Sequence, residues 1–268
     1  MGIKFKQLLI VAGLLLATNA TARNTYNFNS DWKIGKSKKT VTLPRAWNEN
    51  EAYKVYIHSM SDSVIWYRKN FILPENAAGK KVFIEFEGAR QAALVIVNGK
   101  EIGLHENGVM AFGFDITDAV KPGKNLIEVR TDNDWKYREK ASNSMFQWNN
   151  NNFNSNYGGL PKNVWLHITD KVYQTLPLYS NLKTTGTYIY AKEFDIQGHA
   201  ATICVETQVK NDTDQPVKRS LKVNVAEMDG KTVCAFEGAE VMIPAFGTAT
   251  LKAEGRAFGL HFWSWGYG

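Results

Sequence analysis

Beyond residue 22, the chain never keeps a helical period of apolar residues for long enough to form a stable helix. It carries instead a succession of short runs that alternate apolar and polar residues or are apolar throughout. Residues 82–86, 112–116, 126–130 and 164–168 are such runs, and turn residues separate them. Short strands at this spacing are typical of a β-sandwich. The sequence therefore predicts an all-β protein.

The strongest local prediction is a β-hairpin around Asn98-Gly99. The apolar run 94–97 precedes this dipeptide, and Lys100-Glu101-Ile102 follows it. A two-residue type I′ turn needs positive φ at both central residues, which Asn and Gly tolerate best. We therefore expect residues 94–97 and 100–102 to pair as neighbouring strands.

The character of the chain changes near residues 176–185, where a second series of short runs begins. Its expected strands are residues 188–194, 202–210, 220–227, 231–236, 239–243 and 248–253. An immunoglobulin-like sandwich has about seven strands. The second series therefore predicts an immunoglobulin-like sandwich that is incomplete.

The N-terminus has the order of a secretory signal peptide. Lys4 and Lys6 precede an apolar core at residues 8–17, and Ala20-Thr21-Ala22 offers small residues for cleavage. The core is too short to span a bilayer, although a membrane anchor or a buried helix is the alternative. We expect residues 1–22 to be removed and the protein to be exported to the periplasm or the medium, with no membrane attachment after cleavage.

Charge and cysteine content exclude several classes of function. The formal charge of +6 is spread among acids without a basic stripe, which disfavours a nucleic-acid partner. No Cys or His spacing matches a metal site. Cys204 and Cys234 are the only cysteines, and Cys204 has the opposite parity to Ile203, Val205 and Val209. It should point away from the core, so a Cys204–Cys234 disulfide is the less favoured alternative.

An ordered set of motifs resembles the sugar-binding module of family 2 glycoside hydrolases. The motifs are Trp66-Tyr67-Arg68-Lys69, Phe86-Glu87-Gly88-Ala89, Val97-Asn98-Gly99-Lys100, Phe114-Asp115-Ile116-Thr117, and Tyr157-Gly158-Gly159-Leu160 with Val164-Trp165-Leu166. Leu160-Pro161-Lys162-Asn163 departs from the family, which usually has Ile and a basic residue after the glycines. The set covers about residues 26–180, and the resemblance implies a jelly-roll, galactose-binding-like sandwich.

The resemblance extends into the second series. Residues 260–268 resemble a Trp-containing segment near the end of the family's immunoglobulin-like module, after which relatives continue into a TIM-type catalytic barrel. We therefore expect a signal peptide at 1–22, a jelly-roll sugar-binding-type domain at 23–180, and a truncated immunoglobulin-like sandwich at 181–268. Trp263, Trp265 and Tyr267 would lack the strands that normally cover them, which would leave the second module marginally stable.

Catalytic residues are not expected within this chain. Glycoside hydrolysis needs two positioned carboxyl groups, which the resemblance places on the barrel. Asn48-Glu49 and Asn50-Glu51 precede the strong strands and are interpreted as ordinary loop residues. Glu85, Glu87 and Asp115 are interpreted as solvated or capping acids. Neither a cofactor nor a metal is expected.

The candidate carbohydrate contacts lie in the loop of residues 143–159, where aromatic residues alternate with many Asn. Aromatic faces stack on pyranose rings, and amides bond their hydroxyl groups. In the family, a loop before the glycine pair helps to shape the barrel's substrate pocket, so Trp148, Asn152 and Asn154 are candidates. The alternative is a connector pinned to the sandwich by its aromatic residues. His105-Glu106-Asn107-Gly108 is a further substrate-side candidate, although a simple turn is favoured.

Three functions follow from these predictions. The first is the non-catalytic front part of an exported β-glycosidase that acts on β-linked galactosides, glucuronides or mannosides and is inactive alone. The second is a free-standing carbohydrate-binding or adhesive β-sandwich protein. The third is a purely structural fragment without a ligand. The sequence leaves the oligomeric state open.

Overall fold

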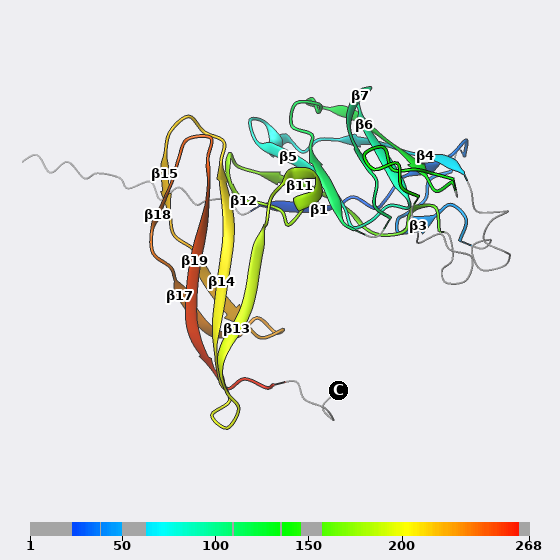
Figure 1. Ribbon diagram of the computed structural model, residues 1–268. Coiled ribbons are helices and arrows are strands. Elements are labelled where there is room, and N and C mark those ends of the chain that lie inside the picture. The colour runs from blue at the N-terminus through cyan, green and yellow to red at the C-terminus, as the bar shows by residue number, and fades with distance from the viewer. Residues whose placement is uncertain are drawn as a thin grey trace, which may run out of the picture.

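The computed structural model describes residues 23–37, 39–49, 63–108, 110–134, 136–145 and 157–262, and Figure 1 shows their arrangement. Antiparallel strands make up nearly all of the regular structure in these ranges, which confirms the all-β prediction. The exceptions within them are a 3₁₀ turn, η1 (Glu75–Ala77), and one helical turn, α1 (Tyr179–Leu182). The predicted signal peptide and Trp263, Trp265 and Tyr267 lie outside the described residues.

The first unit is a jelly-roll sandwich of two main sheets. The larger sheet has the order β2 (Lys33–Ile34), β4 (Val64–Ile72), β9 (Lys124–Asp132), β6 (Ala92–Val97), β7 (Lys100–His105). The smaller sheet has the order β1 (Asn24–Asn27), β11 (Val164–Thr169), β5 (Lys81–Phe86), β8 (Phe112–Asp115). At one end, β3 (Arg45–Ala46) pairs with β10 (Gly159–Leu160).

The core of this unit lies between the two main sheets. Tyr67, Val95 and Val129 from the larger sheet and Ile84 and Phe86 from the smaller sheet are fully buried in one cluster. Each of these positions alternates with a more exposed neighbour for most of its strand, as a half-buried strand requires. Burial of each large apolar side chain stabilises the unit by about 1.5–3 kcal/mol.

The predicted hairpin joins β6 to β7. Asn98 and Gly99 have φ values of 51° and 80°, and Val97 pairs with Lys100. Both φ values are positive, as a type I′ turn requires, so the prediction is confirmed.

The second unit is built on a sheet whose long strands extend away from the jelly roll in Figure 1. β14 (Ala200–Asn211) pairs with β19 (Thr248–Phe258) on one side, and with β13 (Thr187–Asp195) and β12 (Val172–Gln174) on the other. Two short antiparallel strand pairs face this sheet: β15 (Val217–Arg219) with β18 (Val241–Ile243), and β16 (Lys222–Ala226) with β17 (Thr232–Glu237). This is the immunoglobulin-like arrangement that the sequence predicts.

The facing strand pairs cover only part of the sheet. Val205 on β14 is 6% exposed and packs in the core of the second unit. Its register partner on β13, Ile189, lies on the same face but is 65% exposed. Among the described strands, the β13 side of the sheet therefore has no cover, as expected of an incomplete sandwich.

Cys204 lies on the opposite face of β14 from Val205, in register with Tyr190 and Glu254, as its parity predicts. Its neighbours nevertheless cover it to 3% exposure. Cys204 and Cys234 both carry free thiols.

The two units meet through an ion-pair network and a small apolar cluster. Lys81 Nζ of β5 lies 2.5 Å from Asp115 Oδ2 and 3.6 Å from Asp212 Oδ2, which also accepts a hydrogen bond from Tyr173. Phe83 packs with Leu176 and Leu178 beside this network. The domain boundary between residues 180 and 181 stays a prediction, and β12, before it, pairs with β14, after it.

Candidate functional site

The three predicted sugar contacts, Trp148, Asn152 and Asn154, lie outside the described residues, so their roles stay predictions. The structure does describe the two flanks of their loop. On one flank, Arg138 and Met145 form a β-bridge. On the other, Tyr157 lines a cleft in the surface of the jelly roll. The candidate site is therefore built from the residues that surround these flanks.

This cleft, called here the Arg90 cleft, has a volume of about 460 Å³. It lies at the end of the jelly roll where β3 pairs with β10. Its lining comes from segments far apart in the sequence: Pro44, Arg45, Ala46, Glu49, Gly88, Arg90, Gly108, Tyr157, Pro161 and Lys162. A volume of this size suits a small ligand.

The glycine pair before Leu160, Gly158-Gly159, allows the chain segments at this end of the jelly roll to pack closely. The Gly158 carbonyl accepts a hydrogen bond from the Trp47 amide (3.0 Å), and the Gly158 amide donates to Asn48 Oδ1 (2.9 Å). A Cβ on Gly158 would collide with the Trp47 indole nitrogen, and one on Gly159 would collide with the Tyr67 hydroxyl. Gly159 also has a φ of 104°, which favours glycine. The motif therefore serves close backbone packing.

Arg90 is held by its backbone between β10 and the end of β9. Its amide donates to the Gly159 carbonyl (2.9 Å), and the Gly159 amide donates back to the Arg90 carbonyl (3.0 Å). The next amide, of Gln91, donates to the Asp132 carbonyl (2.9 Å). The peptide bond between Arg90 and Gln91 is cis. Burial lowers the pKa of the Arg90 guanidinium, so the charged group is partly removed from water.

The charges of the cleft are mainly positive. Arg45, Arg90 and Lys162 line it, with Glu49 as the one acid among the described lining residues. Glu49 Oε2 lies 3.6 Å from Arg45 NH2, and both side chains are about half exposed. A cleft with this excess of cations attracts anionic groups.

The carboxylates that the sequence analysis considered are committed to structural contacts. Glu87 accepts hydrogen bonds from Trp165 Nε1 (2.8 Å) and Asn163 Nδ2 (2.8 Å), and these bonds lower its pKa. Glu85 Oε2 lies 2.7 Å from His167 Nε2, and Asp115 accepts from the Thr117 amide (3.0 Å). These contacts agree with the structural roles expected for these acids. Glu85 and Glu87 differ from the expectation of solvated acids, because each contacts specific side chains.

Asn48 and the loop at residues 105–108 also hold this end together. The sequence interprets Asn48 as an ordinary loop residue, but its side chain is fully buried. His105 is buried and stacked on Phe112, with ring centroids 4.1 Å apart. Glu106 Oε1 accepts from the Tyr137 hydroxyl (2.5 Å) and the Lys140 amide (2.9 Å), so it fixes the stem of the Asn-rich loop.

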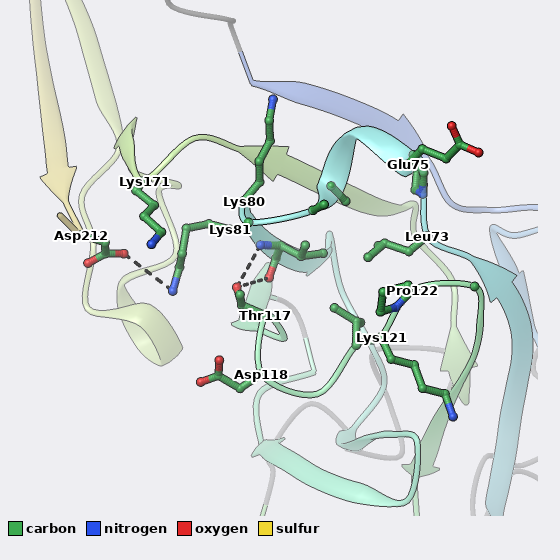
Figure 2. A pocket seen from close by; sticks show the side chains of 17 residues that line it. Leu73, Glu75, Lys80, Lys81, Thr117, Asp118, Lys121, Pro122, Lys171 and Asp212 are labelled. Atoms are coloured by element: carbon green, nitrogen blue, oxygen red, sulfur yellow. Dashed lines mark hydrogen bonds and ion pairs between the residues drawn. The ribbon is translucent and has the colours of Figure 1, made fainter.

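A larger hollow of about 630 Å³ lies at the opposite end of the jelly roll, beside the second unit (Figure 2). Its lining combines aliphatic residues such as Leu73 and Val82 with several charged side chains, and none of its described lining residues is aromatic. Figure 2 shows the ion pair between Lys81 and Asp212 beside it, while the Lys121 side chain extends away from the hollow. The smaller Arg90 cleft differs from this hollow because its lining includes an aromatic residue, Tyr157, beside its charged groups.

The described residues lack two further features. No group of three or more His, Cys, Asp or Glu side chains there could hold a metal ion. No helix in the same ranges is long and apolar enough to cross a membrane.

Comparisons with known proteins agree with the fold. Residues 41–166 match the model of the glycosyl hydrolase 2 galactose-binding domain-like family. A β-glucuronidase of Formosa agariphila is 37% identical over 250 residues, which are 84% of this chain and 25% of that protein. A β-galactosidase of Thermoanaerobacter pseudethanolicus is 33% identical over 162 residues, 54% of this chain and 21% of that protein.

Solved structures give the same result. The structure of a β-glucuronidase from glycoside hydrolase family 2 superposes with a TM-score of 0.77 at 34% identity, over 90% of this chain and 27% of that one. The chain thus spans about a quarter of the length of the curated relatives it matches.

Sequence reasoning missed the cations of the cleft. The motif Phe86-Glu87-Gly88-Ala89 ends one residue before Arg90, and Lys162 falls within the variant segment after the glycine pair. A basic residue between two apolar strands, two positions after a glycine, was the available signal. Nothing local linked it to Arg45 or Lys162.

Proposed function

Because this chain belongs to family 2 of the glycoside hydrolases, as its N-terminal region, we propose that it is the sugar-binding front part of an exported β-glycosidase. The whole enzyme would cleave β-linked galactosides, glucuronides or mannosides by the retaining mechanism without a cofactor. The names of the relatives, β-glucuronidase and β-galactosidase, support the glucuronides and galactosides within this range.

The observation that carries the proposal is the Arg90 cleft. Its lining includes Tyr157, which directly follows the loop segment that holds Trp148, Asn152 and Asn154. A glycan held there would contact an aromatic face and several hydrogen-bond donors, which is the usual composition of a sugar site. The cleft and the loop would then form one binding surface.

We propose further that this region does not hydrolyse glycosides by itself. A retaining enzyme needs two carboxyl groups about 5–5.5 Å apart, one of them available as an acid. Glu85, Glu87 and Asp115 are each engaged by structural partners, which supports a binding role for this region.

The test compares the 268-residue chain with the product of the longest reading frame that contains it, using nitrophenyl β-galactoside, β-glucuronide and β-mannoside. We expect no hydrolysis by the chain and hydrolysis of one or more substrates by the longer product. If the reading frame encodes no further domain and the chain retards β-glycans in affinity electrophoresis, the free-standing carbohydrate-binding protein replaces this proposal.

Export is tested by sequencing the N-terminus of the protein recovered from the host's periplasm and medium. Cleavage after Ala22 would give a mature chain that begins at Arg23. Recovery from the cytoplasm with Met1 or Gly2 at the N-terminus would contradict export.

A further inference from the structure

We propose that the second unit carries a separate binding surface for an uncharged glycan chain, on the side of its main sheet that points away from the core. This surface, called here the Tyr188 surface, consists of Tyr188 and Tyr190 on β13, Glu206 and Gln208 on β14, and Lys252 on β19. It shares no residue with the Arg90 cleft or the Asn-rich loop, so the inference goes beyond the proposed function.

Strand register places these side chains on one side of the sheet. Tyr188 pairs with Glu206, and Glu206 pairs with Lys252, so three neighbouring strands present one residue each in a row. Figure 1 shows β13, β14 and β19 side by side. Gln208 lies two positions after Glu206 and points the same way, whereas Val205 points the opposite way and packs in the core. The Tyr188 surface is therefore the outer side of the sheet.

The two tyrosines form an exposed aromatic pair. Their ring centroids lie 5.3 Å apart with 29° between the ring planes, so Tyr188 is stacked on Tyr190. The Tyr190 hydroxyl in turn interacts with the Cys204 thiol. Tyr188 nevertheless stays 65% exposed, and its hydroxyl forms no hydrogen bond with any described residue. A ring supported on one side can stack on a pyranose with its other side and loses little freedom in doing so.

The charged groups around this pair are already paired with one another. Lys252 Nζ donates to Glu206 Oε1 at 2.8 Å, and Lys192 Nζ donates to Glu254 Oε2 at 2.8 Å. All four side chains stay partly exposed. Sugar hydroxyls can replace the water on such pairs, whereas an apolar protein surface would remove that water without replacing its hydrogen bonds. The Tyr188 surface therefore fits an uncharged glycan better than an anion or an apolar partner.

A hollow of about 350 Å³ continues this surface toward the jelly roll. Gln208 lines it together with Thr184 and Thr248. Gln208 Oε1 accepts from Thr175 Oγ1 (2.9 Å), while the Gln208 side-chain nitrogen has no partner among the described residues. The charged residues of the lining are mostly paired with one another: Lys81, Asp115, Lys210 and Asp212, with Lys183 outside these pairs. Amides and hydroxyls bond sugar hydroxyls, so a glycan stacked on Tyr188 would extend into this hollow.

The experiment begins with affinity electrophoresis of the 268-residue chain in gels that contain β-galactan, β-mannan or mixed-linkage β-glucan. We expect one or more of these neutral polysaccharides to retard the chain. Calorimetry with an oligosaccharide of the retarding polysaccharide then gives the affinity. Because the charges of the surface are paired, the affinity should change by less than about twofold when the salt concentration rises from about 0.1 M to about 1 M.

Variants locate the binding. Tyr188→Ala should weaken it about fivefold, because the stacking ring is lost, and Tyr188→Phe should stay within about twofold of the wild type. Ile189→Ala is the matched control: Ile189 is the next residue, is also 65% exposed, and points to the other side of the sheet. It should bind as the wild type does. Matching thermal unfolding curves establish that the variants are folded.

Three results would overturn the inference. If none of the polysaccharides retards the chain, the Tyr188 surface is not a glycan site, while hydrolysis by the longer gene product separately decides the proposed function. A loss of binding in Trp148→Ala but not in Tyr188→Ala assigns the glycan to the jelly roll, which removes the inference and supports the proposed function. Equal losses in Tyr188→Ala and Ile189→Ala also remove it, because the two side chains point to opposite sides of the sheet.

Discussion

Gly158 has no room for a side chain at the end of the jelly roll that holds the candidate site. Its backbone bonds to Trp47 and to the Asn48 side chain, and the Trp47 indole and Asn133 occupy the space where a Cβ would stand. Asn133 is itself fully buried, so it cannot easily move away. The requirement for glycine here comes from packing.

We expect Gly158→Ala to destabilise the first unit by about 1–3 kcal/mol, because it overpacks a closed site. Gly108→Ala is the matched control in the same cleft: its nearest neighbour would be in ordinary contact, so the change should stay within about 0.5 kcal/mol. Urea unfolding followed by tryptophan fluorescence measures both. Similar midpoints for the two variants would contradict the packing argument.

His105 gives the first unit a pH dependence. Burial lowers the pKa of its imidazole, against the opposing effects of its hydrogen bond to the Asn107 carbonyl (2.9 Å) and of the charge on Glu106. In the unfolded chain, the imidazole takes up a proton near pH 6.5. Below that pH the unfolded chain binds more protons than the folded one, until the lowered pKa is reached. Stability contributed by the neutral ring is therefore complete above about pH 6.5 and falls as the pH drops.

His105→Phe should keep the stack on Phe112 and remove this slope. The wild-type contribution cannot exceed about 1.4 kcal/mol per pH unit for one proton. Unfolding free energies measured from pH 5 to pH 8 test the difference between the two proteins. Parallel pH profiles would rule out His105 as the source.

At the scale of elements, Asn125 shows how the turns at the end of the sandwich opposite the Arg90 cleft are tied together. Its Oδ1 accepts from the Lys121 amide and from Asn98 Nδ2, and its Nδ2 donates to the Lys121 and Gly123 carbonyls, all at 2.8–2.9 Å. The residue is 2% exposed. One amide therefore joins the β6–β7 hairpin to the turn before β9.

Asn125→Ala should destabilise the first unit by about 3 kcal/mol, because it leaves buried backbone groups without partners. Asn224→Ala, at an exposed position on β16, is the control and should change stability by less than about 0.5 kcal/mol. Thermal unfolding monitored by circular dichroism gives both values. A loss of less than 1 kcal/mol in Asn125→Ala would mean that water replaces the lost bonds.

The elements that sequence could predict are those whose pattern is local. Alternation locates β5, β9 and β14, and Asn98-Gly99 locates a turn, because neighbouring residues determine both. The short pairs β3–β10 and β12–β14 are defined by partners more than 30 residues away. The Arg90 cleft belongs to the same class, since residues 44–49, 88–90 and 157–162 come together only after the strands pair. The family resemblance predicted the position of this end, whereas the cations needed the structure.

At the scale of the whole molecule, the two units differ in how completely their cores are covered. The first unit buries a continuous cluster between two sheets, while Ile189 of the second unit stays 65% exposed on a core-facing side. Local opening costs less free energy where fewer apolar contacts close a segment. The second unit should therefore open more often.

Limited proteolysis of the 268-residue chain should cut between residues 187 and 258 before it cuts between 64 and 132. We expect the initial rates to differ by about tenfold or more, which corresponds to a difference of about 1.4 kcal/mol in opening free energy. Mass spectrometry of the first fragments locates the cuts. Equal resistance of the two units would contradict the difference in cover.

Because the jelly roll is long, any tilt at its junction with the second unit would displace its far end. β4 and β9 are nine residues long, about 26 Å, and run from the junction with the second unit to the Arg90 cleft. A tilt of about five degrees at the junction would move the cleft by about 2 Å over that length. Displacements of about 1 Å are enough to impair a reaction that depends on alignment. The network of Lys81, Asp115 and Asp212 therefore helps to fix the orientation of the Arg90 cleft relative to the second unit, although the network and the cleft share no residue.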